Sequence, residues 1–321
     1  MVIRKQCCGA LARAALLGTA LAGGAQAADR SHTVSDKLLL TGGVTQVEGA
    51  AGGGLTPWAV IGGYGTGDQI GGNAFYTRVT TSDYNLETYG ALIGIFDRVE
   101  LSFAKQKFDT GAPGVIVRSV LGAPTDGSFF LRQDIYGLKV RLLGEAVLDQ
   151  DRWLPQVSIG LQHKINSDST GAVAKAVGAT DDEDTDIYLS ATKLLLTQSL
   201  LLNATVRATR ANQFGLLGFG GDKNDSHEAQ FEASFAYLLS PKWAVGGEFR
   251  TKPDNLGLRL GGARVLEEDS AWDVFVAYAP AKNMSLTLAY VDLGRIVSLA
   301  STLAGGEEKQ RGSYVSFQVG Y

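Results

Sequence analysis

Apolar and polar side chains alternate along this chain from residue 57 to its last residue, in segments of about ten residues. In WLPQVSIGLQHKI, residues 153–165, the apolar set Val157, Ile159 and Leu161 alternates with polar residues. Successive side chains of a β-strand point to opposite faces. Each segment therefore predicts a strand with one apolar face, and since no long pattern of period 3.6 follows residue 27, the fold class is all-β.

Strand length and loop length then indicate where such a sheet would be stable. Strands of about ten residues match a tilted strand that crosses a bilayer, whereas strands of soluble sheets are more often five or six residues long. Short turns are expected at 197–199, 240–242 and 281–283. They alternate with long polar segments at 110–128, 166–186, 211–226, 253–269 and 295–310. Short turns on one rim and long loops on the other predict an antiparallel transmembrane β-barrel.

The number of strands follows from counting these segments. Thirteen candidates lie between Pro57 and Tyr321, the first of them at 57–65. Because single-chain bacterial barrels have even strand numbers, a further strand at 37–47 predicts a barrel of 14. The alternative is 12 strands, with one segment used as an inner plug. On either count the barrel spans 57–321, and 28–56 is a Gly-rich segment that forms the first strand or the plug.

The N-terminus is typical of a secretory signal peptide. Arg4 and Lys5 precede an apolar run rich in Ala, Leu and Gly, which ends at AQA, residues 25–27. This order of regions predicts cleavage between Ala27 and Ala28. Both cysteines of the chain, Cys7 and Cys8, lie before this point, so neither disulfides nor thiolate chemistry is available to residues 28–321.

The charge balance of the processed chain is acidic. Removal of residues 1–27 takes three of the 29 basic residues and none of the 33 acidic ones, which leaves a net charge of −7. Nucleic-acid-binding proteins normally carry a basic surface, so nucleic acid is excluded as a partner. No cofactor or metal is expected either. GGYGTG, residues 62–67, lacks the spacing of a dinucleotide-binding loop, and the acidic run 180–186 lacks that of a calcium loop.

The chain ends in the middle of an alternating segment, RGSYVSFQVGY, residues 311–321. One face carries the apolar side chains Val315, Phe317, Val319 and Tyr321. This ending resembles the C-terminal strand of outer-membrane barrels, which closes on an aromatic residue. The resemblance implies that these residues act as an assembly signal for the barrel-assembly machinery.

The stretch GGVTQVEGAAGGGLTPWAVIGGYGTGDQIGGNAFYTRV, residues 42–79, is rich in glycine. Together with YGALIGIFDRVELSFAKQKFDT, residues 89–110, it resembles a proteobacterial exported family known only as a domain of unknown function. The resemblance implies an outer-membrane barrel and brings no functional residues with it. Glycines also let another segment approach a sheet closely, so residues 48–56 folded inward would narrow the pore.

If the apolar faces point to lipid, the opposite faces line the barrel interior. The expected lumen-lining residues are Arg98, Glu100, Lys139, Arg141, Gln162, Lys164, Arg207, Glu232, Glu248 and Arg250. Side chains fill an eight-stranded barrel, and sixteen strands leave an aqueous channel. We therefore expect a narrow outer-membrane pore for small polar solutes, surrounded by lipid and lipopolysaccharide. A closed structural or surface-interaction barrel, with the charges pairing across the wall, is the alternative.

An outer-membrane hydrolase is the third hypothesis, and it would need one of the three histidines, of which His32 lies in the N-terminal leader. Ser226 and His227 are adjacent, so in a strand they point to opposite faces. The position of His163 resembles that of the catalytic histidine in outer-membrane lipases, which carry a serine two residues further along the same strand face. In this chain that position is Ile165. We therefore expect no enzymatic activity.

Overall fold

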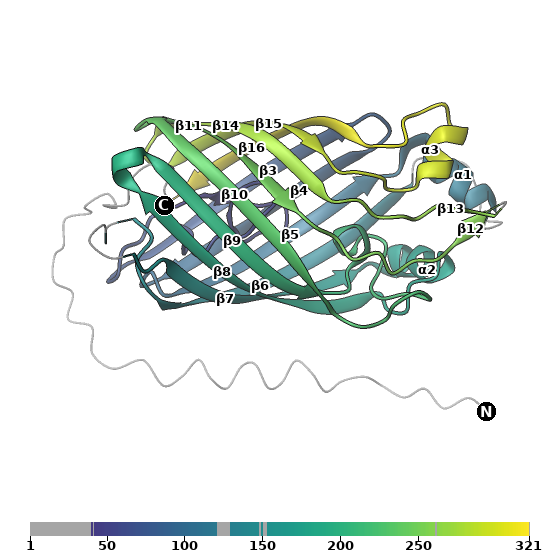
Figure 1. The fold of residues 1–321 in the computed structure, drawn as a ribbon, viewed down its shortest axis with the longest axis horizontal. Helices are drawn as coiled ribbons and strands as arrows, with labels where there is room; N and C mark the ends of the chain where they lie inside the picture. The colour runs from purple at the N-terminus through teal and green to yellow at the C-terminus, as the bar shows by residue number, and fades with distance from the viewer. Residues whose placement is uncertain are drawn as a thin grey trace. The chain divides into compact units, whose positions relative to one another are not determined.

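The structure is a computed structural model, and it describes residues 40, 42–120, 129–147, 149, 153–260 and 262–320 (Figure 1). The predicted cleavage site between Ala27 and Ala28 lies outside these residues, as does the terminal aromatic Tyr321. In the described parts of the chain, no helix is both long and apolar enough to cross a membrane.

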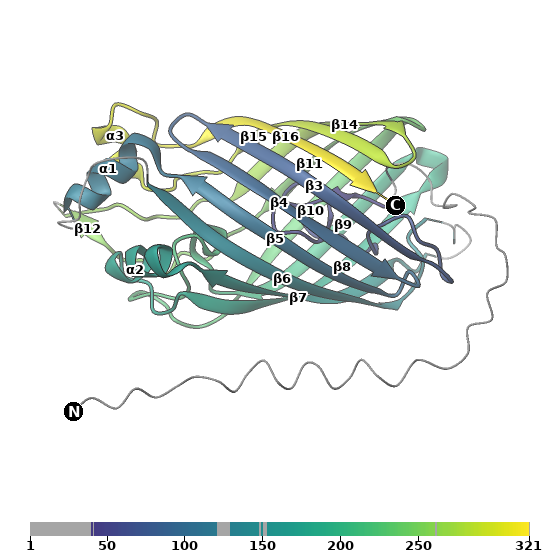
Figure 2. The ribbon, with the colours of Figure 1, turned by 180° about the vertical axis from the view of Figure 1, so that it is seen from behind.

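The described residues from Ile70 onward build a closed antiparallel barrel of 12 strands. Each barrel strand pairs with the next barrel strand along the chain, so that β11 pairs with β14. β16 returns to pair with β3 over nine residues from Gly312 to Gly320 (Figure 2). The barrel strands are β3 (Ile70–Thr81), β4 (Asn85–Ile95), β5 (Val99–Asp109), β6 (Phe130–Leu143), β7 (Gln156–Asn166), β8 (Glu183–Leu195), β9 (Leu200–Thr209), β10 (Glu228–Ser240), β11 (Trp243–Arg250), β14 (Ala271–Ala281), β15 (Met284–Asp292) and β16 (Arg311–Gly320).

The expected count of 14 strands is therefore wrong, and the alternative of 12 is confirmed. The two segments expected as first strands, 37–47 and 57–65, do not enter the barrel sheet in their described parts. Val44–Thr45 (β1) instead pairs with Ala51–Gly52 (β2) in a small separate sheet. The physical reason is closure, because the β3–β16 pairing leaves no free edge for a further strand.

The outward face of the barrel is apolar, as the alternation predicts. On β14, Trp272, Val274 and Val276 are 38 to 52% exposed, while the residues between them are buried. Trp243 stacks on Tyr278 beside the short turns, at a centroid distance of 4.3 Å. Trp272 lies 5.9 Å from Tyr290 beside the long loops. An apolar band between two aromatic girdles is the surface of a barrel that lies in hydrocarbon.

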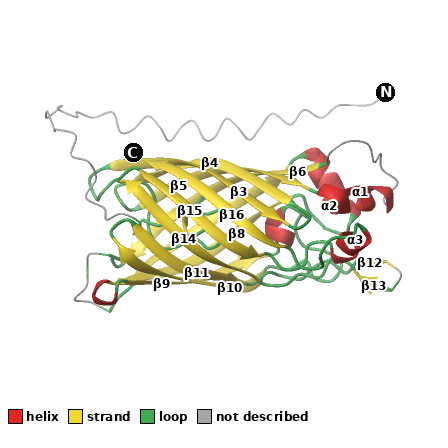
Figure 3. Ribbon diagram, turned by 90° about the horizontal axis from the view of Figure 1, so that it is seen from above, coloured by secondary structure: helices red, strands yellow, loops and turns green. Residues whose placement is uncertain are grey.

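The two ends of the barrel differ in their connections. At the end called here the turn end, the connections 96–98, 196–199, 241–242 and 282–283 are short, and η1 (Leu196–Gln198) lies in one of them. At the opposite end, the loop end, the connections contain α1 (Gly111–Val120), α2 (Asp168–Ala176), η2 (Asn212–Gly215), β12 (Arg259–Leu260), β13 (Ala263–Arg264) and α3 (Ser298–Leu303). Figure 3 shows α1, α2 and α3 gathered at this end.

Candidate functional site

Residues 42–62, the inner segment, lie inside the barrel (Figure 1; Figure 2). From Val44 onward every one of them is buried. The segment folds on itself through backbone hydrogen bonds, with Val47 N donating to Gly54 O over 3.0 Å and Gly53 N to Thr56 O over 2.9 Å. Other backbone groups of the segment find their partners in the barrel wall, among them the nitrogens of Ala51, Leu55, Ala59 and Gly62.

The wall provides these partners from almost its whole circumference. Side chains on ten of the 12 strands, β3 to β11 and β16, form hydrogen bonds with the inner segment. The backbone oxygen of Pro57 accepts three of these hydrogen bonds, from Asn203, Thr205 and Ser190. The inner segment therefore occupies the lumen as a ligand occupies a binding site, by means of polar contacts on many sides.

Glu48 is the charged centre of this arrangement. Its carboxylate accepts a 2.7 Å hydrogen bond from Arg250 and one from Lys164, and Arg207 lies 3.7 Å away. Asp186 and Glu232 complete the cluster, since Asp186 lies 2.8 Å from Lys164 and Glu232 lies 2.5 Å from Arg207. Three buried carboxylates thus face three buried cations, which is the condition under which charges are tolerated away from water.

A second ion pair holds the other half of the inner segment. Glu100 and Lys139 are both 1% exposed and lie 3.1 Å apart. Glu100 accepts from the backbone nitrogens of Ala51 and Gly62, at 3.0 and 2.7 Å. Lys139 donates to the backbone oxygens of Ala51 and Val60, both at 2.9 Å. The pair therefore binds both kinds of backbone group at once.

Glu248 on β11 provides a third attachment for the inner segment. It accepts from Leu55 N at 2.5 Å and from Thr56 Oγ1 at 2.9 Å. Its neighbour across the sheet is Asp273 on β14.

A glycine in the wall lets the inner segment approach closely on another side. A Cβ on Gly94 of β4 would come within 2.1 Å of the backbone oxygen of Gly62.

The structure places the expected lumen-lining residues in two groups. Those buried inside the barrel are Glu100, Lys139, Gln162, Lys164, Arg207, Glu232, Glu248 and Arg250. Arg98 is instead exposed in the turn 96–98. Arg141 lies near the turn end and bonds to Asp97 at 2.6 Å and Glu145 at 2.9 Å. Glu48 was missed, although it is the single acidic residue between Asp36 and Asp68.

The two histidines considered for hydrolysis lie at the loop end. His163 Nδ1 is 2.9 Å from the hydroxyl of Thr185. His227 Nε2 is 3.3 Å from the carboxylate of Asp184. Ser226, the neighbour of His227, binds Asn224 through its backbone nitrogen. Within the described residues, no group of three or more His, Cys, Asp or Glu side chains could hold a metal ion.

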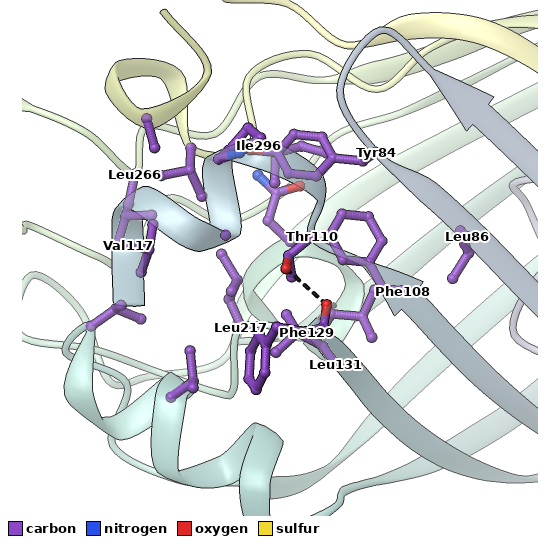
Figure 4. Close-up of a pocket in the computed structure, with 18 of the residues that line it drawn as sticks. Tyr84, Leu86, Phe108, Thr110, Val117, Phe129, Leu131, Leu217, Leu266 and Ile296 are labelled. Carbon is purple, nitrogen blue, oxygen red and sulfur yellow. Dashed lines mark hydrogen bonds between the residues drawn. The ribbon is translucent and has the colours of Figure 1, made fainter. Parts of the chain in front are cut away.

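A cavity of about 120 Å³ lies above the inner segment at the loop end (Figure 4). Its wall is almost wholly apolar and comes from β3 to β6, from the long loops and from Val47 and Leu55 of the inner segment. In Figure 4, Phe108 and Leu131 from the barrel wall face Val117, Leu217 and Ile296 from three different loops. This cavity could not be predicted from the sequence, because residues far apart in the chain build it.

Phe214 connects the cavity to the charged centre. Its ring lies 4.5 Å from the Arg250 guanidinium and 5.4 Å from the Lys252 ammonium, and its backbone oxygen accepts from Lys164 at 3.1 Å. Gln213 and Phe214 both have left-handed backbone angles, with φ of 45° and 61°. Non-glycine residues adopt such angles at an energetic cost, and they are found mainly where function requires them.

Beside Phe214, a buried acid and base form a further contact between loops. Glu268 lies 3.5 Å from Lys252 and accepts a 2.7 Å hydrogen bond from the backbone nitrogen of Gln213. Burial raises the pKa of Glu268 to about 7, although the Lys252 charge opposes the rise. Burial also lowers the pKa of Lys252. This contact therefore changes its charge close to neutral pH.

Solved structures resemble the fold at low sequence identity. The "KdgM porin" is 8% identical with a TM-score of 0.46, covering 77% of this chain and 98% of its own. The "NanC porin" is 9% identical with a TM-score of 0.45, covering 78% and 98%. The "COG4313 outer membrane channel from Pseudomonas putida F1" is 12% identical with a TM-score of 0.40, covering 83% and 97%. All three TM-scores lie below 0.5, so these likenesses decide nothing about function.

No curated protein matches the chain. A family model does match it, over residues 41–318, which include the inner segment and all but the last residues of the barrel. The resemblance seen in the Gly-rich stretch is thereby confirmed over most of the chain. The chain belongs to the family described as "Protein of unknown function (DUF3034)".

Proposed function

We propose that this protein is an outer-membrane channel for small solutes in which the inner segment closes the resting barrel. The observation that carries the proposal is the way the segment is held. Hydrogen bonds and ion pairs from ten strands attach it to the wall. Water can replace such contacts, so the segment can leave its place without unfolding the barrel.

The location follows from the two surfaces of the barrel. An apolar exterior requires hydrocarbon around it, and a closed sheet leaves no backbone group unpaired there. The predicted signal peptide, with cleavage between Ala27 and Ala28, would export the chain, and Val315, Phe317, Val319 and Tyr321 would direct its assembly. The long loops then face lipopolysaccharide outside the cell, and the turn end faces the periplasm.

The polar side chains of the lumen do not by themselves show that the solute is polar. Lys139, Glu100 and Glu248 serve the backbone of the inner segment in the closed state. When the segment moves, the same side chains line the passage. A barrel of 12 strands is wider than one whose own side chains fill it and narrower than an open porin, which suits small solutes.

Conductance in planar lipid bilayers tests the proposal. The processed chain is compared with a variant in which a Gly/Ser linker of equal length replaces residues 42–62. We expect rare, small steps from the native chain and larger, sustained steps from the variant. Folding of both is checked by the change in gel mobility on heating. Silence of a folded variant would refute the channel and leave the closed structural barrel.

A further inference from the structure

The apolar cavity at the loop end is not needed for the barrel to close or for the inner segment to bind. Loops whose only task was to cover the barrel would collapse onto one another, since an unfilled apolar cavity destabilises a fold. Here three helical loops and the barrel wall enclose about 120 Å³ instead. We propose that this cavity binds the apolar part of a small solute that carries one hydrogen-bond donor.

The size of the cavity limits the apolar part. A cavity of about 150 Å³ lined by Leu, Ile and Phe stays dry and takes up benzene. The cavity here has a similar lining, in which Phe108, Leu131, Leu216 and Leu266 take part, and a slightly smaller volume. One aromatic ring or a short alkyl chain therefore fits, and a sugar, whose hydroxyl groups would lose their water, does not.

An unpaired acceptor atom in the cavity wall indicates that the solute carries a hydrogen-bond donor. Most polar side chains that line the cavity are satisfied within the protein. Tyr84 pairs with Ser301 at 3.2 Å, and Thr110 donates to Phe129 O at 2.8 Å. Gln106 is different, because its Nε2 donates to Val47 O while its buried Oε1 has no partner among the described residues. Gln106 lines the cavity but is only 1% exposed, so a hydroxyl on the bound solute would reach this oxygen after a small rotation of the amide, and the oxygen's isolation is otherwise unfavourable.

The position of the cavity links binding to the inner segment. Val47 and Leu55 form part of its wall, so a bound solute touches the segment directly. Val47 also accepts the hydrogen bond from Gln106. On another side Phe214 separates the solute from Lys164 and Arg250, which hold Glu48. The solute therefore binds at the outer side of the closed passage. The cavity as a binding site does not depend on the channel proposal, whereas its role in solute entry rests on the proposed function.

Binding is measured with the processed chain in lipid nanodiscs, by fluorine NMR titration of 4-fluorophenol and fluorobenzene against empty nanodiscs. We expect saturable binding of both probes. The hydroxyl should make 4-fluorophenol bind about fivefold more tightly, the effect of one ordinary hydrogen bond. Absence of saturable binding would overturn the proposal, and equal affinity for the two probes would overturn the part that assigns the donor to Gln106.

Two variants locate the binding. Ala300→Phe places a ring in the cavity from α3 and should weaken both probes at least tenfold. Ala91→Phe adds the same ring on the exposed face of β4 and should change neither. If Ala300→Phe fails to fold, Val117→Thr keeps the shape of the site, adds a hydroxyl and should weaken fluorobenzene. Undiminished binding in a folded cavity variant would overturn the site.

Conductance separates this inference from the channel proposal. A protein that conducts and binds neither probe would retain the channel and end the inference. A protein that binds 4-fluorophenol, loses that binding with Ala300→Phe and never conducts would retain the cavity as a binding site and end the channel.

Discussion

Arg250 on β11 donates a 2.7 Å hydrogen bond to the carboxylate of Glu48, a residue 202 positions earlier in the chain. Both side chains are buried, and the bond ties the inner segment to the barrel wall at the level where Lys164 and Arg207 also converge. A buried charge that loses its partner is strongly destabilising. The stability of the closed state therefore depends on this carboxylate more than on any single apolar contact of the segment.

Glu48→Gln should release the inner segment. The substitution keeps the shape of the side chain but leaves three cations facing two carboxylates. Breaking a buried pair costs about 3–5 kcal/mol. We expect this loss of stability to appear as faster hydrogen exchange in residues 42–62 and as more frequent channel openings in bilayers. Glu308→Gln is the control, because Glu308 is 63% exposed and 3.8 Å from Arg295, and exposed pairs contribute little. Native exchange rates in Glu48→Gln would contradict the central role of this residue.

Gly94→Ala should push the segment away from the wall without altering any charge. The added Cβ would lie 2.1 Å from Gly62 O, which is backbone and can yield only if the segment moves. We expect loss of the Glu100 bond to Gly62 N, seen as faster exchange at Gly62. Gly67→Ala is the matched control, since a Cβ there meets nothing within 4 Å. Equal exchange in both variants would show that the close approach is unimportant.

Glu100 and Lys139 should show strong coupling in a double-mutant cycle. Glu100→Gln or Lys139→Met alone leaves one buried charge unpaired, which costs about 3–5 kcal/mol. The double variant leaves none, so its loss should be smaller than the sum of the two by about 1–3 kcal/mol. The free energy of local opening is obtained from hydrogen exchange at Ala51 and Gly62. Additive losses would mean that the two side chains bind the segment independently.

The loop contact around Glu268 should weaken as the pH rises. The folded-state pKa of Glu268, about 7, lies above its ordinary value of 4.5. Folding therefore favours the protonated acid, so the stabilisation is complete below about pH 4.5 and is lost by about pH 7, on the order of 3 kcal/mol. Lys252 and Asp254 face the same site, the former opposing the rise in pKa and the latter adding to it.

Thermal unfolding between pH 4.5 and pH 8 measures this effect. The native chain should lose stability over the lower part of the range, whereas Glu268→Gln, which cannot ionise, should show a flatter profile. Glu308→Gln should follow the native chain, because its carboxylate is exposed. Parallel profiles for the native chain and Glu268→Gln would show that Glu268 ionises at its ordinary pKa.

The alternation of side chains was enough to predict much of the wall. Ile159 and Leu161, which the alternation places on the apolar face, are exposed on the outside of β7, and Val315, Phe317 and Val319 are exposed on the outside of β16. The period of two is a local property of each strand, so it survives whatever the strand pairs with. Arg98 was misplaced for a local reason too, since it lies in the turn 96–98, where alternation ends.

The partners of the inward-facing polar side chains could not be predicted from the alternation. Lys164 and Arg207 belong to the inward alternation, but their partner Glu48 comes from a segment that the period of two cannot distinguish from a first strand. The choice between 14 and 12 strands depended on whether residues before Ile70 pair with a strand edge or with lumen side chains. That choice is made by the closing pairs between β3 and β16, which are contacts between the first and the last strand of the barrel.

An all-β barrel with an apolar exterior is predictable from the order of residues alone, because strand geometry converts a period of two directly into two faces. The path of the inner segment, the partners of Glu48 and the cavity beneath the loops depend instead on tertiary contacts. Those features depend on side chains such as Val47, Phe108, Phe214 and Ile296, which meet only after the ring has closed and the loops have folded over it.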